Sequence, residues 1–198
     1  MSSVLPVLGA LVAAAITPGP NNLIVMEAGA RGGIAAACAA ILGVLSGSLV
    51  LLVLVWFGLD TLIEAMPILA SVLTLAGGAY LAWLGLSLLL RHRSSTSHKA
   101  LPSTLLGVAT FQLLNPKAWM LIATAVAAIS DVGGLLVLSI LVVLVTSTCL
   151  SLWALAGAVA AQLLQKPRAR DVFERSMGAV LALSAAGIVI DALLRQGA

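Results

Sequence analysis

The chain has 198 residues, of which 62% are hydrophobic and only 9% are charged, and its formal net charge is +3. Soluble domains carry about 25% charged residues, so this composition excludes a soluble globular fold. Apolar blocks of roughly 20 residues, each long enough to cross a hydrocarbon core of about 30 Å as a helix, predict an all-α membrane protein instead.

Six transmembrane helices are predicted from the apolar blocks that Gly, Pro or polar clusters separate. In chain order they span about 4–27, 34–58, 67–90, 103–129, 134–163 and 176–194. The first block resembles the core of a signal peptide, but no Lys or Arg precedes it and its apolar character continues to Met26. We therefore expect it to be retained as a membrane span.

The first and the fourth span are each interrupted by proline. The first is interrupted by Thr17, Pro18, Gly19, Pro20, Asn21 and Asn22, and the fourth by Asn115, Pro116 and Lys117. Counted from the start of each span at about 1.5 Å per residue, both breaks lie near the middle of the bilayer. Two broken helices at matching depth predict a binding site between them.

Each break is expected to expose backbone groups. Proline has no N–H and clashes with the carbonyl four residues earlier. The carbonyls that should lose their partners are those of Ala14, Ile16 and Gln112. The first amides of each following half-helix should be free donors at a positive dipole end. These amides belong to Asn21, Asn22, Lys117 and Ala118. Free carbonyls suit an ammonium and free amides suit a carboxylate, so the two breaks together suit a zwitterionic amino acid.

The polar segment 91–102 divides the six spans into three and three. Its position predicts a first three-helix repeat over 1–90, a basic cytoplasmic linker over 91–102 and a second three-helix repeat over 103–198. Pro18 and Pro116 are 98 positions apart, and Gly78 and Gly178 open apolar stretches 100 positions apart. Because three is odd, equivalent helices run in opposite directions, which is the arrangement of an inverted repeat.

The basic residues gather on one predicted side of the membrane. That side receives Arg31, the linker 91–102 and the segment 166–175, which together hold eight of the ten Lys and Arg residues. The positive-inside rule then places this side in the cytoplasm and both termini outside. Membrane topology explains the basic charge, so no nucleic-acid partner is expected.

No cofactor or metal is expected. Cys38 and Cys149 each lie in an apolar block without a second Cys or a His at metal-ligand spacing, and are interpreted as small core residues. Both histidines, His92 and His98, lie in the polar linker.

The predicted substrate-binding residues are those of the two breaks and one residue before the second: Thr17, Pro18, Gly19, Pro20, Asn21, Asn22, Gln112, Asn115, Pro116 and Lys117. Lys117 is the most informative, because a cation deep in a span costs at least about 2.5 kcal/mol on insertion scales. Its alternative role is to snorkel or to hold a backbone carbonyl. The amide side chains could coordinate substrate, satisfy the backbone that the prolines free, or do both.

Other polar positions have two interpretations each. Glu27 could couple transport to protons, but an interfacial pair with Arg31 is favoured, and Asp191 is expected to be interfacial. The polar run in the fifth span is expected to make hydrogen bonds between helices, with cavity lining as the alternative; it comprises Thr146, Ser147, Thr148 and Ser151. Close helix packing is expected at two GxxxG pairs, Gly29 with Gly33 and Gly43 with Gly47.

Three stretches resemble the LysE/RhtB family of amino-acid exporters. They are Thr17-Pro18-Gly19-Pro20-Asn21-Asn22-Leu23, Gly77-Gly78-Ala79-Tyr80-Leu81-Ala82-Trp83-Leu84-Gly85 and Leu114-Asn115-Pro116-Lys117-Ala118-Trp119. The stretch Trp153-Ala154-Leu155-Ala156-Gly157 resembles the branch that contains cysteine and O-acetylserine exporters.

The resemblance implies efflux of an amino acid or a close derivative across the bacterial inner membrane by a secondary carrier. The family's motif positions fall on Pro18, Gly19, Pro20, Asn21, Asn115, Pro116 and Lys117. Many relatives carry Asp where this chain has Asn21, which favours a small neutral or polar substrate over a cationic one.

Three functions compete at this point. The first is an exporter that works by alternating access, with the two halves rocking about the broken helices. The second is an intramembrane enzyme with a Ser/Lys dyad of Lys117 and one of the serines Ser46, Ser48 or Ser147. The third is a non-transporting scaffold, against which the matching breaks argue. Lipid surrounds the spans in every case, and the Gly-rich helix faces would permit a homodimer.

Overall fold

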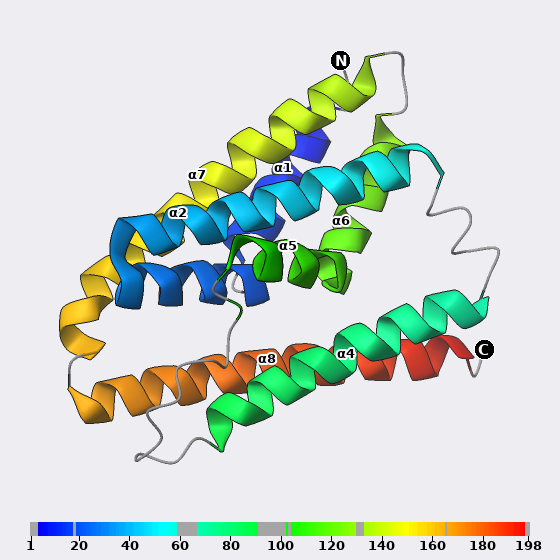
Figure 1. The fold of residues 1–198 in the computed structure, drawn as a ribbon. Coiled ribbons are helices and arrows are strands. Elements are labelled where there is room, and N and C mark those ends of the chain that lie inside the picture. The colour runs from blue at the N-terminus through cyan, green and yellow to red at the C-terminus, as the bar shows by residue number, and fades with distance from the viewer. Residues whose placement is uncertain are drawn as a thin grey trace.

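A computed structural model of the chain describes residues 4–17, 19–58, 67–90, 102, 104–129, 133–164 and 166–196. Its helices are α1 (Val4–Ile16), α2 (Pro20–Trp56), α4 (Pro67–Leu89), α5 (Leu105–Leu113), α6 (Pro116–Ala128), α7 (Gly134–Leu164) and α8 (Pro167–Gln196) (Figure 1). No strand occurs in these ranges, so the prediction of an all-α fold is confirmed for them.

Both proline breaks separate two helices. The first lies between α1, which ends at Ile16, and α2, which begins at Pro20; the second lies between α5, which ends at Leu113, and α6, which begins at Pro116. Proline fits the first position of a helix because its missing N–H would have no partner there. Each break therefore ends one helix and starts the next.

Helix α2 reverses direction at Gly33, which has φ 66° and ψ −158° (Figure 1). An L side chain rarely adopts this conformation, whereas glycine does so without steric cost. We call residues 20–32 the first arm of α2 and residues 34–56 its second arm. The predicted first span thus corresponds to α1 with the first arm, and the second span to the second arm. Gly33 makes this turn and not the close helix contact expected of it.

The sixth span starts earlier than predicted. Helix α8 begins at Pro167, so Asp171 and Arg175 are helical and form an ion pair at 3.7 Å. Apolar blocks miss a polar first stretch such as this one. The linker 91–102 lies outside the described residues except for Pro102, as do Asp60, Glu64, Asp131 and the side chain of Asp191.

Within the described residues, two helical segments are long and apolar enough to cross a membrane, Pro20–Trp56 and Gly134–Ala161. Shorter apolar helical segments are Val4–Ile16, Leu75–Leu89 and Lys117–Ala128. Since α2 turns at Gly33, its second arm supplies much of the first segment.

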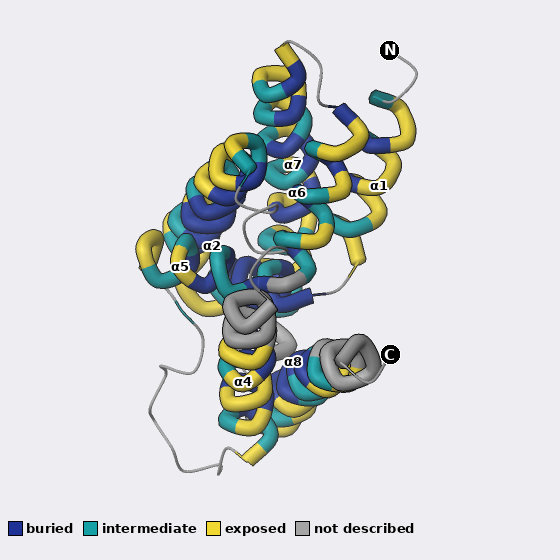
Figure 2. The backbone as a smooth tube through the Cα atoms, turned by 90° about the vertical axis from the view of Figure 1, so that its right-hand side faces the viewer, coloured by how far each residue is buried: buried dark blue, intermediate teal, exposed yellow. Residues whose placement is uncertain are grey.

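Helices α4 and α8 form a pair that lies below the other helices in Figures 1 and 2. Their backbones come close at Gly85 and Gly178, where a Cβ on Gly85 would lie 2.8 Å from the Gly178 carbonyl oxygen. The ring of Tyr80 on α4 contacts Phe111 on α5 at a centroid distance of 5.5 Å. This contact joins the pair to the remaining helices.

Small residues also let α2 approach α7 and α5. A Cβ on Gly157 would lie 2.0 Å from the Met26 carbonyl oxygen, and one on Gly29 would lie 2.5 Å from that of Ala154. On the second arm, Gly43 and Gly47 face α5, where a Cβ on either would lie 2.7 Å from an α5 side chain. The close packing expected at Gly43 and Gly47 is confirmed.

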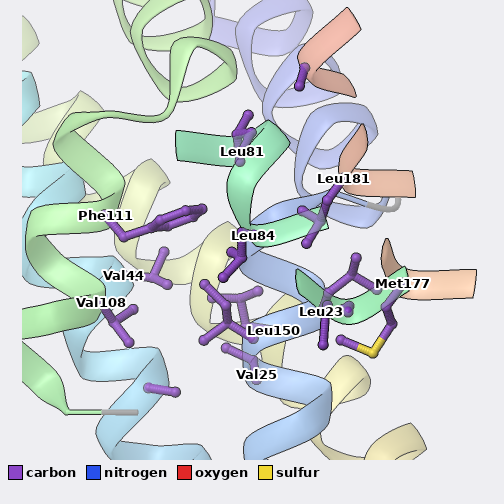
Figure 3. Close-up of a cluster of buried hydrophobic side chains, with 14 residues drawn as sticks. Leu23, Val25, Val44, Leu81, Leu84, Val108, Phe111, Leu150, Met177 and Leu181 are labelled. Carbon is purple, nitrogen blue, oxygen red and sulfur yellow. The ribbon is translucent and has the colours of Figure 1, made fainter. Parts of the chain in front are cut away.

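Two apolar clusters form the core. One joins the two arms of α2 with α4, α5, α7 and α8, and includes Leu84, Phe111 and Leu181 (Figure 3). The other joins α1, α6, α7 and the second arm of α2, and includes Leu11, Leu51 and Leu138. Both helix breaks lie where these two clusters meet.

Candidate functional site

A cavity of about 70 Å³ lies where the two helix breaks come together. At about 10–15 Å³ for each water, this is room for roughly five water molecules. Its lining residues come from α1, α2, α5, α6 and α7; they are Leu11, Ala14, Ala15, Gly19, Pro20, Asn21, Asn22, Val44, Ser48, Gln112, Asn115, Lys117, Ala118, Leu121, Ile122, Val142, Thr146 and Leu150. Among the described residues of this lining, Lys117 is the one with a charged side chain.

Lys117 lies on the second break and reaches the first. Its Nζ donates a hydrogen bond of 3.2 Å to the carbonyl oxygen of Thr17. A Cβ on Gly19 would lie 3.3 Å from the same Nζ, so the small size of Gly19 leaves space for the ammonium. The cation of one break is thus held by the backbone of the other, 100 positions away.

Side-chain amides form a network on the other side of the cavity. Gln112 is 4% exposed, and its Oε1 accepts hydrogen bonds from Asn21 Nδ2 at 2.7 Å and from Asn115 Nδ2 at 3.3 Å. Its Nε2 donates to Ser48 Oγ at 2.7 Å. Asn115 Oδ1 caps α6 by accepting from the Lys117 backbone N–H at 3.2 Å. The network links α2, α5 and α6.

One atom of this network has no hydrogen-bond partner among the described residues. Asn21 Oδ1 is buried and accepts no hydrogen bond. Such an acceptor costs about 1–3 kcal/mol, and native proteins contain few of them. Because Asn21 lines the cavity, a bound donor is a natural partner for this oxygen.

The carbonyls at the first break are satisfied by one side chain. Asn22 is 5% exposed, and its Nδ2 donates at 2.9 Å to the carbonyl oxygens of both Ala15 and Thr17. Asn22 is therefore occupied by the backbone, which is one of the two roles expected of it.

The second break corrects the expectation of free backbone groups. The Gln112 carbonyl accepts from the Asn115 N–H at 3.1 Å, and the Ala118 N–H donates to the Asn115 carbonyl at 2.9 Å. The Lys117 N–H is capped by the Asn115 side chain. The chain turns tightly over Leu114 and Asn115, so neighbouring groups replace the partners that Pro116 removes. Side chains, not free amides, supply the donors here.

The part of the cavity lining that α7 contributes is mostly apolar. Val142, Thr146 and Leu150 lie four residues apart on α7 and so share one face of that helix. Leu11 of α1 and Leu121 of α6 complete this wall. The cavity therefore has a polar end with one cation and an apolar side.

Glu27 lies outside the cavity lining and within an ion-pair cluster. Arg31 Nε lies 3.0 Å from Glu27 Oε1, and the Arg31 guanidinium also donates to Glu174 on α8. The predicted pair of Glu27 with Arg31 is confirmed. The added partner Glu174, 8% exposed, ties the first arm of α2 to α8.

Seven of the ten predicted binding residues line the cavity: Gly19, Pro20, Asn21, Asn22, Gln112, Asn115 and Lys117. Thr17 contributes its carbonyl oxygen to Lys117. Pro116 starts α6, and its side chain and Pro18 lie outside the described part of the structure. From the sequence, Ser48 was expected only in the enzymatic alternative. It lies four residues after Val44, so both side chains share the helix face that lines the cavity.

The polar run of α7 differs from expectation. Thr146 lines the cavity, whereas Ser147 donates to the Leu144 carbonyl of its own helix at 3.2 Å, not to another helix. A Ser/Lys dyad finds no support in the described contacts, because Lys117 Nζ donates to Thr17 and Ser48 accepts from Gln112.

A sequence model of the family described as LysE type translocator matches residues 12–192. The chain is 36% identical over 109 residues to a protein named leucine efflux protein from Enterobacter sp. (strain 638), covering 52% of each chain. It is also 36% identical over 109 residues to the leucine efflux protein of Klebsiella pneumoniae, and 34% identical over 113 residues to that of Salmonella typhimurium, covering in each case 52% of this chain and 51% of the relative.

The chain spans about half the length of the curated relatives it matches. No solved structure matches it. The family match covers both breaks, the cavity lining except Leu11, and all of the described helices except parts of α1 and α8. The chain therefore belongs to the LysE type translocator family.

Proposed function

We propose that this protein exports a neutral amino acid, or a close derivative, across the bacterial inner membrane as a secondary transporter. The observation that carries the proposal is the cavity at the junction of the two breaks, whose described lining residues include one cation, no carboxylate and several apolar side chains. A cationic amino acid would meet Lys117 without a compensating carboxylate. Membership in a translocator family supports transport over catalysis.

The substrate carboxylate is held by the Lys117 ammonium, and the substrate ammonium by Asn21 Oδ1. A charge-assisted hydrogen bond contributes about 1.5–3 kcal/mol, so these two contacts contribute about 3–6 kcal/mol together. Burial of the substrate side chain must contribute as well, to offset the cost of association. Asn115 is occupied as the cap of α6 and as a donor to Gln112, so it is not assigned to either charge of the substrate. The substrate side chain lies against the α7 wall.

The side chain of the substrate is small or aliphatic. Val142, Leu150 and Leu121 favour an aliphatic group, as does the similarity to proteins named leucine efflux protein. A cavity of about 70 Å³ is small for a ligand site, so a substrate of the size of leucine requires the wall to move apart.

Transport by alternating access rests on an inverted repeat of two three-helix halves. Five pairs of positions support it, each 98 apart: Pro18 and Pro116, Thr17 and Asn115, Val44 and Val142, Ser48 and Thr146, and Ala15 and Leu113. Thr17 and Asn115 lie at the two breaks. Val44 and Val142 both line the cavity, and so do Ser48 and Thr146.

The last pair is informative because both carbonyls receive a side-chain donor. Ala15 accepts from Asn22, and Leu113 accepts from the Trp119 indole N–H at 2.7 Å. In addition, α5 packs on the second arm of α2, while α1 packs on α7. Each broken helix thus packs against the middle helix of the other half, as an inverted repeat requires.

The inner membrane, external termini and basic cytoplasmic linker remain part of the proposal and follow from the positive-inside rule. Proton coupling is proposed as well, with Glu27 as the carboxylate predicted for it. The ion pair of Glu27 with Arg31 supports the alternative, which is an interfacial role for Glu27.

The experiment is counterflow in proteoliposomes that contain the purified protein. Labelled leucine, alanine, cysteine, lysine and glutamate are compared, with and without a pH gradient. Saturable exchange of the neutral amino acids, and none of lysine, is expected. Exchange of lysine in preference to every neutral amino acid would overturn the proposed substrate class. An exchange rate that is the same with and without the pH gradient would overturn proton coupling.

A further inference from the structure

The backbone N–H of Lys117 fixes which way the side-chain amides of the cavity are turned. The Lys117 N–H can only donate, so the atom of Asn115 that faces it at 3.2 Å must be the oxygen. The amino group of Asn115 then points to Gln112, so the atom of Gln112 that it meets must be Oε1. The direction of each hydrogen bond follows from the one before it.

The same rule reaches Asn21. Because Gln112 Oε1 is an acceptor, the atom of Asn21 that lies 2.7 Å from it must be the amino group Nδ2. Gln112 Nε2 then donates to Ser48 Oγ, which fixes the other end of the glutamine. The Asn21 carbonyl oxygen is left turned away from Gln112, buried and without a partner among the described residues.

We propose that Gln112 and Ser48 are positioning residues that hold the Asn21 amide as an obligate hydrogen-bond acceptor, and that this makes the site select substrates with an ammonium group. The inference rests on the proposed function. Without the network, the Asn21 amide could turn by 180° and present its amino group as readily as its oxygen. Leucine would then have to select the acceptor orientation of the Asn21 amide, and its advantage over acids that lack the ammonium would shrink.

The proposal predicts discrimination between L-leucine and 4-methylpentanoate. The two share the carboxylate and the aliphatic chain, but only leucine has the ammonium. The discrimination ratio is the concentration of 4-methylpentanoate that halves leucine counterflow, divided by the concentration of unlabelled leucine that does so. For the wild type, loss of one charge-assisted hydrogen bond predicts a ratio of roughly ten to a hundred.

Substitution Gln112→Met keeps the length of the side chain and removes its amide. The ratio is expected to fall about twofold, because leucine must then select one of two amide orientations. In the double variant Gln112→Met with Asn21→Asp the ratio should return, because both oxygens of a carboxylate are acceptors and no orientation needs to be fixed. A merely structural role of Gln112 would lower transport of both compounds alike and would not be rescued in this way.

Ser48→Ala tests the far end of the network and should lower the ratio by less than Gln112→Met does. Its matched control is Ser139→Ala on α7, whose hydroxyl donates to its own helix at the Leu135 carbonyl and which is not in the lining. The control ratio should equal that of the wild type. If Gln112→Met does not fold, the Ser48→Ala and Ser139→Ala pair carries the test.

The outcomes separate the two proposals. Folded wild type that exchanges no neutral amino acid contradicts the proposed function and the inference with it. Wild type that exchanges leucine, together with an unchanged ratio in Gln112→Met or Ser48→Ala, contradicts the inference alone. A ratio that falls in Gln112→Met and returns in the double variant supports it.

Discussion

Within its own half of the chain, the first helix break is held by one side chain, and the second by two. At the first, Asn22 donates to the carbonyls of both Ala15 and Thr17. At the second, Asn115 caps α6 while the Trp119 indole donates to the Leu113 carbonyl. The same proline-induced loss of backbone hydrogen bonds is thus compensated differently in the two halves.

This difference gives the cavity its polarity. The Thr17 carbonyl accepts from Asn22 and from Lys117, so the first break offers a backbone acceptor to the cation of the second. The position of Lys117 is taken by Gly19 in the first half, 98 positions earlier. Equivalent backbones with different side chains therefore give one site with one cation, not two.

The largest effect is expected from Lys117→Met, which removes the only charge among the described residues of the lining. The initial rate of neutral amino-acid counterflow should fall by about a hundredfold or more, because the substrate carboxylate loses its charged donor. The matched control is Lys166→Met at an exposed position just before α8, which should keep the wild-type rate. A folded Lys117→Met protein that transports within a few-fold of the wild type would refute this role.

Asn22→Leu should destabilise the protein more than Trp119→Phe. Each variant leaves one carbonyl without a side-chain donor, that of Ala15 or that of Leu113, and the first variant also removes one of the two donors to the Thr17 carbonyl. The difference in stability is the net contribution of that one hydrogen bond, about 0.5–1.5 kcal/mol. Chemical denaturation in detergent measures it. An equal loss of unfolding free energy in Asn22→Leu and Trp119→Phe would mean that Asn22 and Trp119 stabilise their breaks to the same extent.

Asn115→Ala removes the cap of α6 and one donor to Gln112. A lost helix cap costs about 0.5–2 kcal/mol. Thr104→Ala is the matched control, because Thr104 caps α5 through the Gly107 N–H at 3.1 Å but lies outside the cavity lining. Both variants should lose similar stability, and only Asn115→Ala should also raise the KM for substrate. An unchanged KM in Asn115→Ala would mean that the amide network does not contribute to substrate binding.

Gly19→Ala is expected to have the smallest effect. Gly19 has φ −163°, which any residue adopts, so the backbone is not strained by the change. The new methyl group would lie 3.3 Å from Lys117 Nζ and would displace the ammonium by a few tenths of an ångström. The KM should rise a few-fold with folding unchanged. If Gly19→Ala lowers stability more than substrate affinity, then Gly19 is needed for the backbone conformation and not for the space beside Lys117.

The places of the breaks were predictable because their cause is local. Pro20 and Pro116 each start a helix where the sequence indicates, and the helix bounds of α4 and α7 agree with the predicted spans within a few residues. The matched spacing of the two prolines also indicated that the breaks would meet. Lys117 and Thr17, from opposite halves, meet as that spacing requires.

The partners within the site were not predictable, because they depend on how helices pack. Ser48 is an ordinary serine in an apolar block until Gly47 allows α5 to bring Gln112 against it. The Gln112 carbonyl was expected to be free, yet the turn over Leu114 and Asn115 supplies it with a donor. Proline indicates which partner is lost, whereas tertiary structure decides which group replaces it.

The central claim is that one substrate occupies the cavity between the two breaks. Single cysteines at Ala14 and Ala118 sample it from the two halves, in a background with Cys38→Ser and Cys149→Ala. The measurement is the rate of thiol alkylation with and without saturating leucine, with Gly9→Cys outside the lining as the control. The account predicts that leucine protects positions 14 and 118 and leaves position 9 unchanged. Protection of neither cavity position, or of only one, by a substrate that the protein transports would contradict it.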